Sequence, residues 1–300
     1  MYAFNRLYIA ERKRKMNRYQ RKKITALLCA SALFFVFFGF FRGIALYFGA
    51  AEEQNTPYGW KKMSAYTTYY NTDDVGRCEN IAIAASLIDG TTLQPYGEFS
   101  FNKTVGRRTA AAGFKQAKII INGEYVLGVG GGVCQVSTTL YNAALKSGLC
   151  AIEYHPHSLR VPYVAPSRDA MVSSECDLQL YNPHSFPVYL SATVFEGGLR
   201  VTFYGEKAVD RYELVSHVLE EIPSPAPIVK EGKEDGILRS PKNGVKSEMF
   251  LECYRGERLL SRKRVRIDEY RPIQGIIVKK IAEPTIKIVS NDCLFFKKLL

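Results

Sequence analysis

Length and composition limit the possible folds before any motif is considered. The chain has 300 residues, of which 47% are hydrophobic and only 13 are proline. This balance excludes a disordered chain and allows most of the sequence to bury a core. Of the formal net charge of +12, nine Lys or Arg less one acid place +8 within residues 1–23, which leaves only +4 elsewhere. So small a remaining charge argues against nucleic acid as a partner.

An uncharged apolar run occupies residues 24–41 and continues past Arg42 to residue 49. Eighteen residues at about 1.5 Å each give roughly 27 Å, close to the thickness of a bilayer core. The run predicts a transmembrane helix over 24–49, and the basic tail 1–23 predicts a cytoplasmic N-terminus. We therefore expect a single-pass protein of the cytoplasmic membrane with an extracytoplasmic C-terminal domain. A cleaved signal peptide is the alternative, because Gly49-Ala50-Ala51 offers small residues for cleavage.

Four further segments are expected beyond the apolar run. Residues 50–77 are polar and aromatic without sustained periodicity, which is typical of a linker. Residues 78–205 mix helical and strand-like patterns, whereas residues 206–282 contain strand-like runs broken by proline-rich loops. The predicted fold class is α+β, with a mixed sheet in the first domain, then a small all-β module and a tail over 283–300.

Local signals place two early elements of the first domain. Apolar residues at helical spacing between 81 and 88 predict a short helix that stops before Gly90. The strand-like runs 118–122 and 125–129 meet at Asn122-Gly123, a dipeptide that readily takes the positive φ angles of a type I′ turn. We expect a β-hairpin there.

Three glycines, residues 130–132, separate this hairpin from the pattern of a central helix. Apolar residues at helical spacing run from Cys134 to Lys146, and Gly148 follows as a plausible C-cap. Strands are expected at residues 150–154, 177–180, 187–195 and 199–204. Cys134 is therefore predicted to start the central helix.

Cys134 is the leading candidate for a chemical role. A helix N-terminus stabilises a thiolate and lowers the pKa of the thiol. His155 and His157 follow soon afterwards, and imidazole is the usual base for an activated cysteine. Asp169 could orient such a histidine, and the amides of Gly130 to Val133 could polarise a carbonyl group.

Structural explanations of the same residues stay open. A free cysteine is commonly buried as a small hydrophobe, and a glycine run can serve close packing alone. Arg107, Arg108 and Arg168 could bind carboxylate or phosphate, or simply face solvent. Some of the 19 tyrosines could stack on sugar rings, or all could belong to the core.

No cofactor or metal is expected. The chain contains no Walker loop, dinucleotide-binding fingerprint or metalloprotease helix. Its seven cysteines are scattered without CxxC spacing, so they indicate neither a zinc site nor a disulfide scaffold, and an isolated disulfide stays possible.

One long block carries a family resemblance: GVGGGVCQVSTTLYNAAL, residues 128–145. Shorter groups accompany it, namely Gly97-Glu98-Phe99-Ser100-Phe101-Asn102, Val105-Gly106, Gly113-Phe114, His155-Pro156-His157-Ser158, Ser167-Arg168-Asp169-Ala170, and Asp177-Leu178 with Asn182. On these residues the stretch from Asn80 to about Gly205 resembles the VanW family, named for an accessory protein of a B-type vancomycin resistance cluster.

The resemblance implies a Gram-positive envelope protein whose partner is peptidoglycan or its precursors, but it supplies no reaction. It also implies that Cys134, His157, Arg168 and Asp169 form one site. The residues expected to be catalytic are Cys134, His157, His155 and Asp169. Those expected to bind a ligand are Gly130, Gly131, Gly132, Gln135, Ser137, Ser158 and Arg168.

The segment after Arg211 resembles a degenerate G5-type module, a frequent companion in this family. Its expected closing strand contains Tyr270-Arg271-Pro272-Ile273 and Ile276-Ile277. Lys279-Lys280 stand where a glycine is expected, which weakens the role in binding amino sugars that the resemblance would imply.

Two hypotheses about function follow. The first is a cysteine-nucleophile hydrolase or transferase that acts on peptidoglycan, with Cys134 as nucleophile and a histidine as base. The second is a non-catalytic cell-wall-binding or scaffold protein, in which arginines and surface tyrosines hold acidic or sugar groups while the glycines shape a groove.

Overall fold

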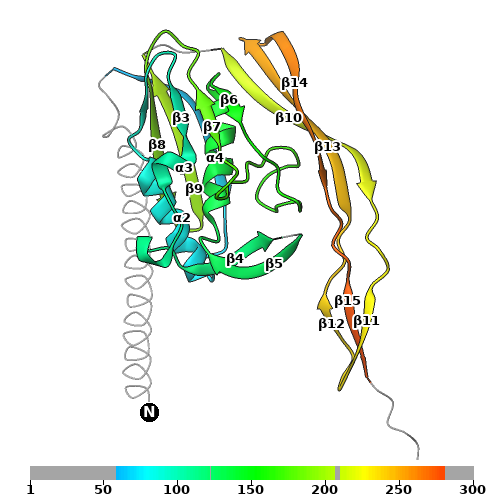
Figure 1. Cartoon of the computed structure of the whole chain (residues 1–300). Coiled ribbons are helices and arrows are strands. Elements are labelled where there is room, and N and C mark those ends of the chain that lie inside the picture. Colours follow the sequence, from blue (N-terminus) through cyan, green and yellow to red (C-terminus); the bar gives the residue numbers. More distant parts are fainter. Residues whose placement is uncertain (1–58, 122, 207–209, 281–300) are drawn as a thin grey trace, which may run out of the picture. The chain divides into compact units, whose positions relative to one another are not determined.

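The computed structural model describes residues 59–121, 123–206 and 210–280 of the chain (Figure 1). Within these ranges it contains fifteen strands, three α-helices and one short 3-10 helix. The expected α+β balance is therefore wrong, because the described part of the chain is mostly β. Part of the difference lies in the expected linker, where Lys61–Tyr69 form a strand of nine residues. The mixed sheet expected in the first domain is also wrong, because all its described strand pairs are antiparallel.

The N-terminal half is built on a four-stranded antiparallel sheet in the order β1-β9-β8-β2. Its strands are β1 (Lys61–Tyr69), β2 (Thr92–Leu93), β8 (Val188–Phe195) and β9 (Gly198–Gly205). β1 pairs along the whole of β9, from Lys61 opposite Gly205 to Tyr69 opposite Gly198. The segment that the sequence presented as a linker thus contributes the edge strand of this sheet.

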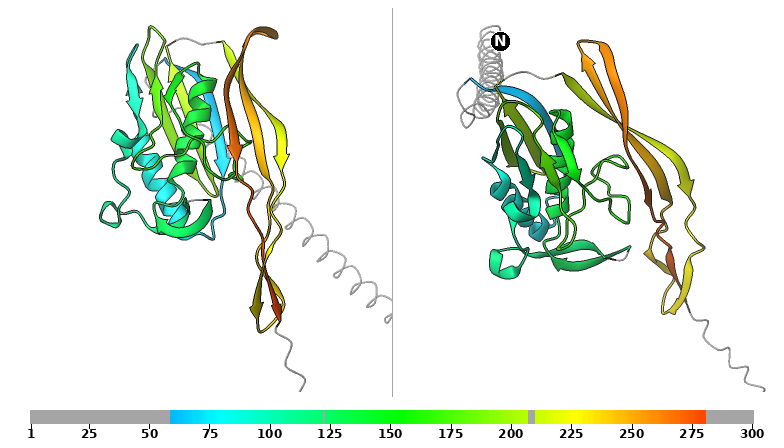
Figure 2. Two further views of the ribbon diagram at one scale, coloured as in Figure 1. Left: turned by 45° about the vertical axis from the view of Figure 1, so that its right-hand side comes forward. Right: turned by 45° about the horizontal axis from the view of Figure 1, so that its top comes forward.

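Two helices, α2 (Val75–Ile88) and α4 (Val133–Lys146), pack against this sheet (Figures 1 and 2). α4 contacts β1 and β9, α2 contacts β8, and the helices contact each other. Twelve of the 14 residues of α4 are buried, so it is the central element of the core. Its fully buried Val136, Leu140 and Ala143 belong to the same apolar cluster as Val201 of β9.

Smaller elements surround this layer. They are β3 (Glu98–Ser100), α3 (Phe101–Val105), the 3-10 turn η1 (Ala110–Ala112), β4 (Gln116–Ile121), β5 (Glu124–Val129), β6 (Cys150–Glu153) and β7 (Gln179–Tyr181). The order β3-β7-β6 makes a three-stranded sheet, and β4 with β5 makes the predicted hairpin, in which Gly123 has φ of +79°. The hairpin leads directly into the glycines before α4.

The C-terminal half consists of two three-stranded sheets. β10 (Arg211–Ile222), β13 (Gly244–Arg255) and β14 (Arg258–Tyr270) form an antiparallel sheet of long strands (Figure 2). In the second sheet β15 (Ile276–Lys280) lies between β11 (Ile228–Gly232), which runs parallel to it, and β12 (Gly236–Arg239), which runs antiparallel. Side-chain and backbone bonds join the first sheet to the N-terminal half, including the ion pair between Lys146 of α4 and Glu213 of β10 at 2.7 Å.

The predicted membrane segment over 24–49 lies outside the described residues, as do the basic tail 1–23 and the tail 283–300. Between residues 59 and 280, no described helix combines the length and the apolar character needed to cross a bilayer. The structure does not support the single-pass localisation expected from the sequence, and we withdraw that expectation.

The place of α4 at the centre of the core yields a stability prediction. Replacement of the fully buried Leu140 by alanine leaves a cavity between α4 and the sheet, which should lower the free energy of unfolding by about 2 to 5 kcal/mol. Urea unfolding followed by circular dichroism measures the change. The matched control is Leu87→Ala on α2, where the side chain is 44% exposed. This substitution should lower the free energy of unfolding by only about 0.5 kcal/mol. Equal effects of the two substitutions would contradict the central role of α4.

Candidate active site

The glycine run places Cys134 in the first turn of α4. Gly130 and Gly132 have φ of +90° and +109°, in the left-handed region that favours glycine. A Cβ on Gly131 would lie 2.7 Å from Cβ of Ala117 and 2.7 Å from the carbonyl oxygen of Lys118, so no larger residue fits between hairpin and helix. The run therefore makes the tight turn that brings the thiol to the helix N-terminus, where the helix dipole favours a thiolate.

Asn80 of α2 fixes this turn from the other side. It is fully buried, and its Nδ2 donates to the carbonyl oxygen of Gly131 at 2.9 Å and to that of Lys115 at 3.0 Å. Its Oδ1 accepts from the amide of Lys115 at 2.7 Å. One side chain thus ties the glycine turn to the strand that leads into the hairpin, a role that the sequence did not reveal.

His157 and Asp169 form a buried pair, with 5% and 1% of their side chains exposed. Oδ2 of Asp169 accepts from Nδ1 of His157 at 2.7 Å and from the backbone amide of His157 at 2.7 Å. Because Nδ1 carries the proton in this bond, Nε2 is the ring nitrogen that can interact with Cys134. The amide of Met171 donates to the carbonyl oxygen of His155 at 2.8 Å, which holds the two segments of the pair together.

The electrostatics of the three groups favour a thiolate beside an imidazolium. Burial alone would raise the pKa of Cys134, but the hydrogen bond and charge of His157 outweigh it, with smaller help from the Val172 carbonyl and the Arg108 charge, so the pKa is lowered. Burial alone would lower the pKa of His157, but its bonds to Asp169 and Cys134 raise the pKa to about 9. The pKa of Asp169 is lowered, because hydrogen bonds from His157 and Tyr270 overcome the effect of burial.

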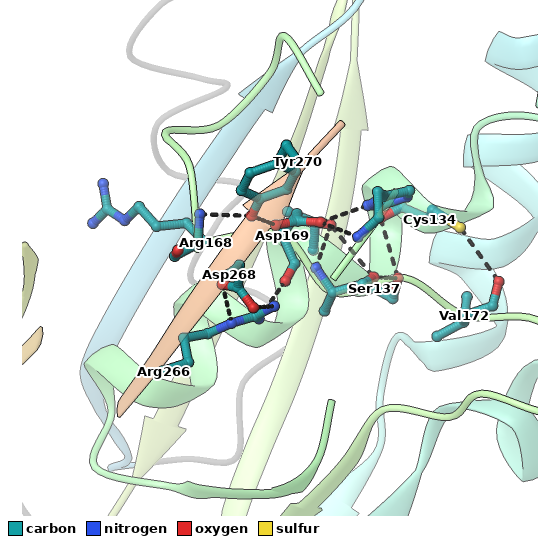
Figure 3. A network of polar contacts seen from close by, with 12 residues as sticks. Cys134, Ser137, Arg168, Asp169, Val172, Arg266, Asp268 and Tyr270 are labelled. Atoms are coloured by element: carbon teal, nitrogen blue, oxygen red, sulfur yellow. Dashed lines mark hydrogen bonds and ion pairs between the residues drawn. The ribbon is translucent and has the colours of Figure 1, made fainter. Parts of the chain in front are cut away.

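Strand β14 supports Asp169 from the far side of the pair (Figure 3). The hydroxyl of Tyr270 donates to Oδ1 of Asp169 and accepts from the amide of Ser167 at 2.7 Å. Nη1 of Arg266 donates to the carbonyl oxygen of Asp169 at 2.8 Å. Arg266 is itself held by Asp268, with Nε 2.6 Å from Oδ2 and Nη2 2.9 Å from Oδ1. Residues 266, 268 and 270 alternate along the strand, so they share one face.

The other predicted site residues lie elsewhere. Nε2 of His155 lies 3.0 Å from Oε1 of Glu153, whereas the ring that bonds Asp169 is that of His157. The guanidinium of Arg168 donates to the carbonyl oxygen of Leu214 at 2.9 Å, so it connects its own segment to β10. Ser158 accepts through its carbonyl oxygen from the amide of Arg271 at 2.8 Å.

Ser137 and Gln135 are buried in α4 and bonded within the protein. Oγ of Ser137 donates to the carbonyl oxygen of Ala170 at 2.6 Å. Nε2 of Gln135 donates to Thr68 and to the carbonyl oxygen of Tyr69, and its Oε1 accepts from Arg77 at 2.6 Å. Both side chains position neighbouring segments.

The backbone donors near the thiol are fewer than the glycine run suggested. The amide of Gly130 donates to the carbonyl oxygen of Lys115 at 3.0 Å, and that of Val133 donates to Gly130 at 3.1 Å. Among the described residues the amide of Cys134 has no such partner, as expected in the first turn of a helix. Cys134 thus offers both a nucleophile and a donor for a developing oxyanion.

A cavity of about 1200 Å³ opens beside the thiol. Cys134 and His157 line it together with the glycine turn, the loop around Arg107 and Arg108, and the hairpin residues Ile119 and Tyr125. His155, Arg168 and Ser158 are not among its lining residues. The cavity therefore gives a substrate access to Cys134 and His157 and to none of these three other candidates.

Comparison with known proteins is consistent with this architecture. A model of the family described as "VanW like protein" matches residues 76–204, the segment that holds Cys134, His157 and Asp169. The match covers somewhat under half of the chain, so it is residues 76–204 that are similar to the VanW family. A relative, "Uncharacterized protein YoaR" of Bacillus subtilis (strain 168), is 38% identical over 173 residues, which are 57% of this chain and 55% of the relative.

The chain therefore spans about half the length of that relative. A solved structure titled "Crystal structure of HP0197-G5" aligns with 23% of this chain and 97% of its own, at 12% identity and a TM-score of 0.14. So low a score supports no argument about fold, and the G5-like nature of the C-terminal strands stays a prediction.

The contact between Tyr270 and Asp169 generates a prediction about the thiol. Tyr270→Phe removes a hydrogen bond that stabilises the ionised carboxylate, so Asp169 should hold the imidazolium of His157 less firmly. The pKa of His157 should then fall and that of Cys134 should rise, which is measured as the pH dependence of alkylation at Cys134. The free energy of unfolding should also fall by about 1 to 3 kcal/mol, because two buried polar groups lose a partner.

Tyr254→Phe on β13 is the matched control, since that hydroxyl bonds Glu252 at 2.6 Å and makes no contact with Asp169. It should leave the alkylation profile of Cys134 unchanged. A purely structural role for Tyr270 would lower stability in the variant while the pH profile of the thiol stayed as in the wild type.

Proposed function

We propose that this protein is a cysteine-dependent acyl-transferring enzyme, a hydrolase or transferase, whose substrate is the peptide part of peptidoglycan. The observation that carries the proposal is the spatial arrangement of Cys134, His157 and Asp169, in which Cys134 and His157 line a cavity of about 1200 Å³. In this arrangement the pKa of the Cys134 thiol is lowered. The similarity of residues 76–204 to the VanW family supports the cell wall as the source of the substrate.

The geometry suits a two-step reaction. In the first step the thiolate of Cys134 attacks a carbonyl carbon, and the oxyanion that forms accepts a hydrogen bond from the amide of Cys134. The imidazolium of His157 then gives its Nε2 proton to the leaving amine, so that an acyl thioester remains on the enzyme. In the second step water or another amine attacks the thioester, His157 takes up the proton, and Cys134 leaves as a thiolate.

Asp169 keeps His157 in the tautomer and orientation that this exchange needs. Its Oδ2 holds Nδ1 and the backbone amide of the same residue, which prevents the ring from turning. A buried carboxylate also stabilises the imidazolium that stands opposite the thiolate. The arrangement therefore supports nucleophilic catalysis without a metal ligand or cofactor in any of these roles.

The pH dependence of thiol alkylation tests the activated nucleophile. Iodoacetamide should modify Cys134 at a rate that is already high below the ordinary thiol pKa of about 8.5, since the rate follows the thiolate fraction. In His157→Ala the midpoint should move upward by about one pH unit or more. Mass spectrometry of the individual cysteine peptides measures the rates, and the exposed Cys150 is the reference thiol in the same sample. A Cys134 midpoint that His157→Ala leaves in place would contradict the proposal.

Release of soluble fragments from purified cell-wall sacculi tests the reaction itself. The wild-type chain should release peptide fragments, and Cys134→Ser should release none while it sediments with the sacculi to the same extent. A wild-type chain that sediments and releases nothing would support the non-catalytic wall-binding hypothesis instead. The basic and aromatic lining of the cavity, with Arg77, Arg107 and Tyr125, is the observation that favours this second function.

A further inference from the structure

The cavity beside Cys134 is strongly basic. Among the described residues that line it, Arg77, Arg107, Arg108 and Lys118 are cations, whereas Asp74 is the one carboxylate. Oδ1 of Asp74 already accepts from the backbone amide of Arg77 at 3.1 Å, as the N-cap of α2. The cavity thus presents an excess of positive charge close to the nucleophile.

Arg77 is held in place without being neutralised. Its Nη2 donates to Oε1 of Gln135 at 2.6 Å, and its guanidinium lies 5.9 Å from the ring centre of Tyr163. Gln135 is 1% exposed and is fixed by bonds to Thr68 and to the backbone of Tyr69. Within the described part of the chain no carboxylate pairs with Arg77, so its charge is oriented and available to a ligand.

Arg107 and Arg108 bring further positive charge from the loop after α3. Nη2 of Arg108 donates to the carboxamide oxygen of Asn102 at 2.5 Å, and its charge contributes to the lowered pKa of Cys134. Arg107 is exposed, and the structure gives its side chain no ion pair with any described residue. Between residues 59 and 280 no described carboxylate forms an ion pair with either guanidinium, although the charge of Asp177 acts on Arg108.

The β4–β5 hairpin adds large apolar side chains to the lining of the cavity. Ile121 and Tyr125 are 49% and 46% exposed, and both line the cavity together with Val129. Large apolar side chains exposed at a cavity commonly serve to contact a ligand. The hairpin thus offers an apolar surface for the neutral part of a molecule whose charged end lies among the arginines.

We infer that the acyl substrate of Cys134 carries a negative charge, and that it is a short peptide with a free carboxylate bound by Arg77 and Arg107. The inference rests on the proposed function, because it assumes that Cys134 is the nucleophile. A carboxylate matches the planar fork of a guanidinium and is the anion that a peptide acyl donor itself supplies. The hairpin contacts the side chains of that peptide.

Two alkylating reagents that differ in charge test the selection of an anion. Iodoacetate and iodoacetamide attack the same sulfur, so the ratio of their rates at Cys134, divided by the ratio for free cysteine, isolates the influence of the cavity. At low salt the wild-type chain should favour iodoacetate by about tenfold relative to free cysteine, the rate equivalent of one charge-assisted contact. Arg107→Gln and Arg77→Gln should each reduce the preference several-fold.

Lys103→Gln is the matched control, because Lys103 is an exposed cation of α3 that does not line the cavity. It should leave the preference unchanged. A reactive Cys134 with no preference for iodoacetate would overturn this inference and leave the proposed function intact. A Cys134 that reacts with neither reagent faster than the exposed Cys150 would overturn the proposed function, and this inference with it.

Protection identifies the kind of anion. N-acetyl-alanyl-alanine should slow the alkylation of Cys134 by iodoacetamide, whereas its C-terminal amide at the same concentration and ionic strength should not. Protection by the acid should weaken in Arg107→Gln. Equal protection by the acid and the amide, or stronger protection by inorganic phosphate than by the acid, would overturn the assignment of a peptide carboxylate.

Discussion

The carboxylate of Asp169 is the point on which the rest of the site depends. It is 1% exposed, and a charge buried to that extent is tolerated only where hydrogen bonds replace its hydration. The replacements come from two distant parts of the chain, since His157 binds one oxygen and Tyr270 the other. A change that removes one partner therefore acts on all of them, because the same charge is shared.

Asp169 must also be held in place through its backbone, which explains why α4 is rich in polar residues that are nonetheless buried. Beyond Cys134 the helix offers Ser137, Thr138 and Asn142 to the segment 168–170. Ser137 donates to the carbonyl oxygen of Ala170 at 2.6 Å, Thr138 accepts from its amide at 3.0 Å, and Asn142 donates to Arg168 at 2.7 Å. The helix that carries the nucleophile thus also holds the backbone around Asp169, which keeps the two groups in a fixed relation.

Local chemistry could be predicted from the sequence, and long-range pairing could not. The hairpin at Asn122-Gly123 and the place of Cys134 at a helix start follow from nearby residues, because turn geometry and helical spacing are short-range signals. The pairing of β1 with β9 joins residues more than 120 positions apart, and no local pattern specifies such a register. The membrane helix was inferred from hydropathy alone, and the described structure does not support it.

The choice between His155 and His157 shows the same limit within the site. Both lie near Cys134 in sequence and both flank Pro156, so the residues alone left both open. The structure separates them through their acidic partners, Glu153 for His155 and Asp169 for His157, and Asp169 is a contact that the chain makes only by folding back. Arg266 and Asp268 of β14 could not be predicted as supporting residues, because Arg and Asp side chains are mostly exposed to solvent.

The buried ion pair between Arg266 and Asp268 is better explained by the group that it positions than by a gain in stability. Both side chains are at most 6% exposed, and the cost of removing two charges from water commonly offsets their attraction, so apolar residues of similar size could serve a core as well. Apolar residues could not donate to the carbonyl oxygen of Asp169 as Nη1 of Arg266 does at 2.8 Å. Asp268 fixes the guanidinium through one hydrogen bond and one ion-pair contact, and the guanidinium in turn fixes the backbone of the residue that orients His157. The C-terminal strands thus act on the candidate site through a chain of directed hydrogen bonds, which a merely adjacent module would not need.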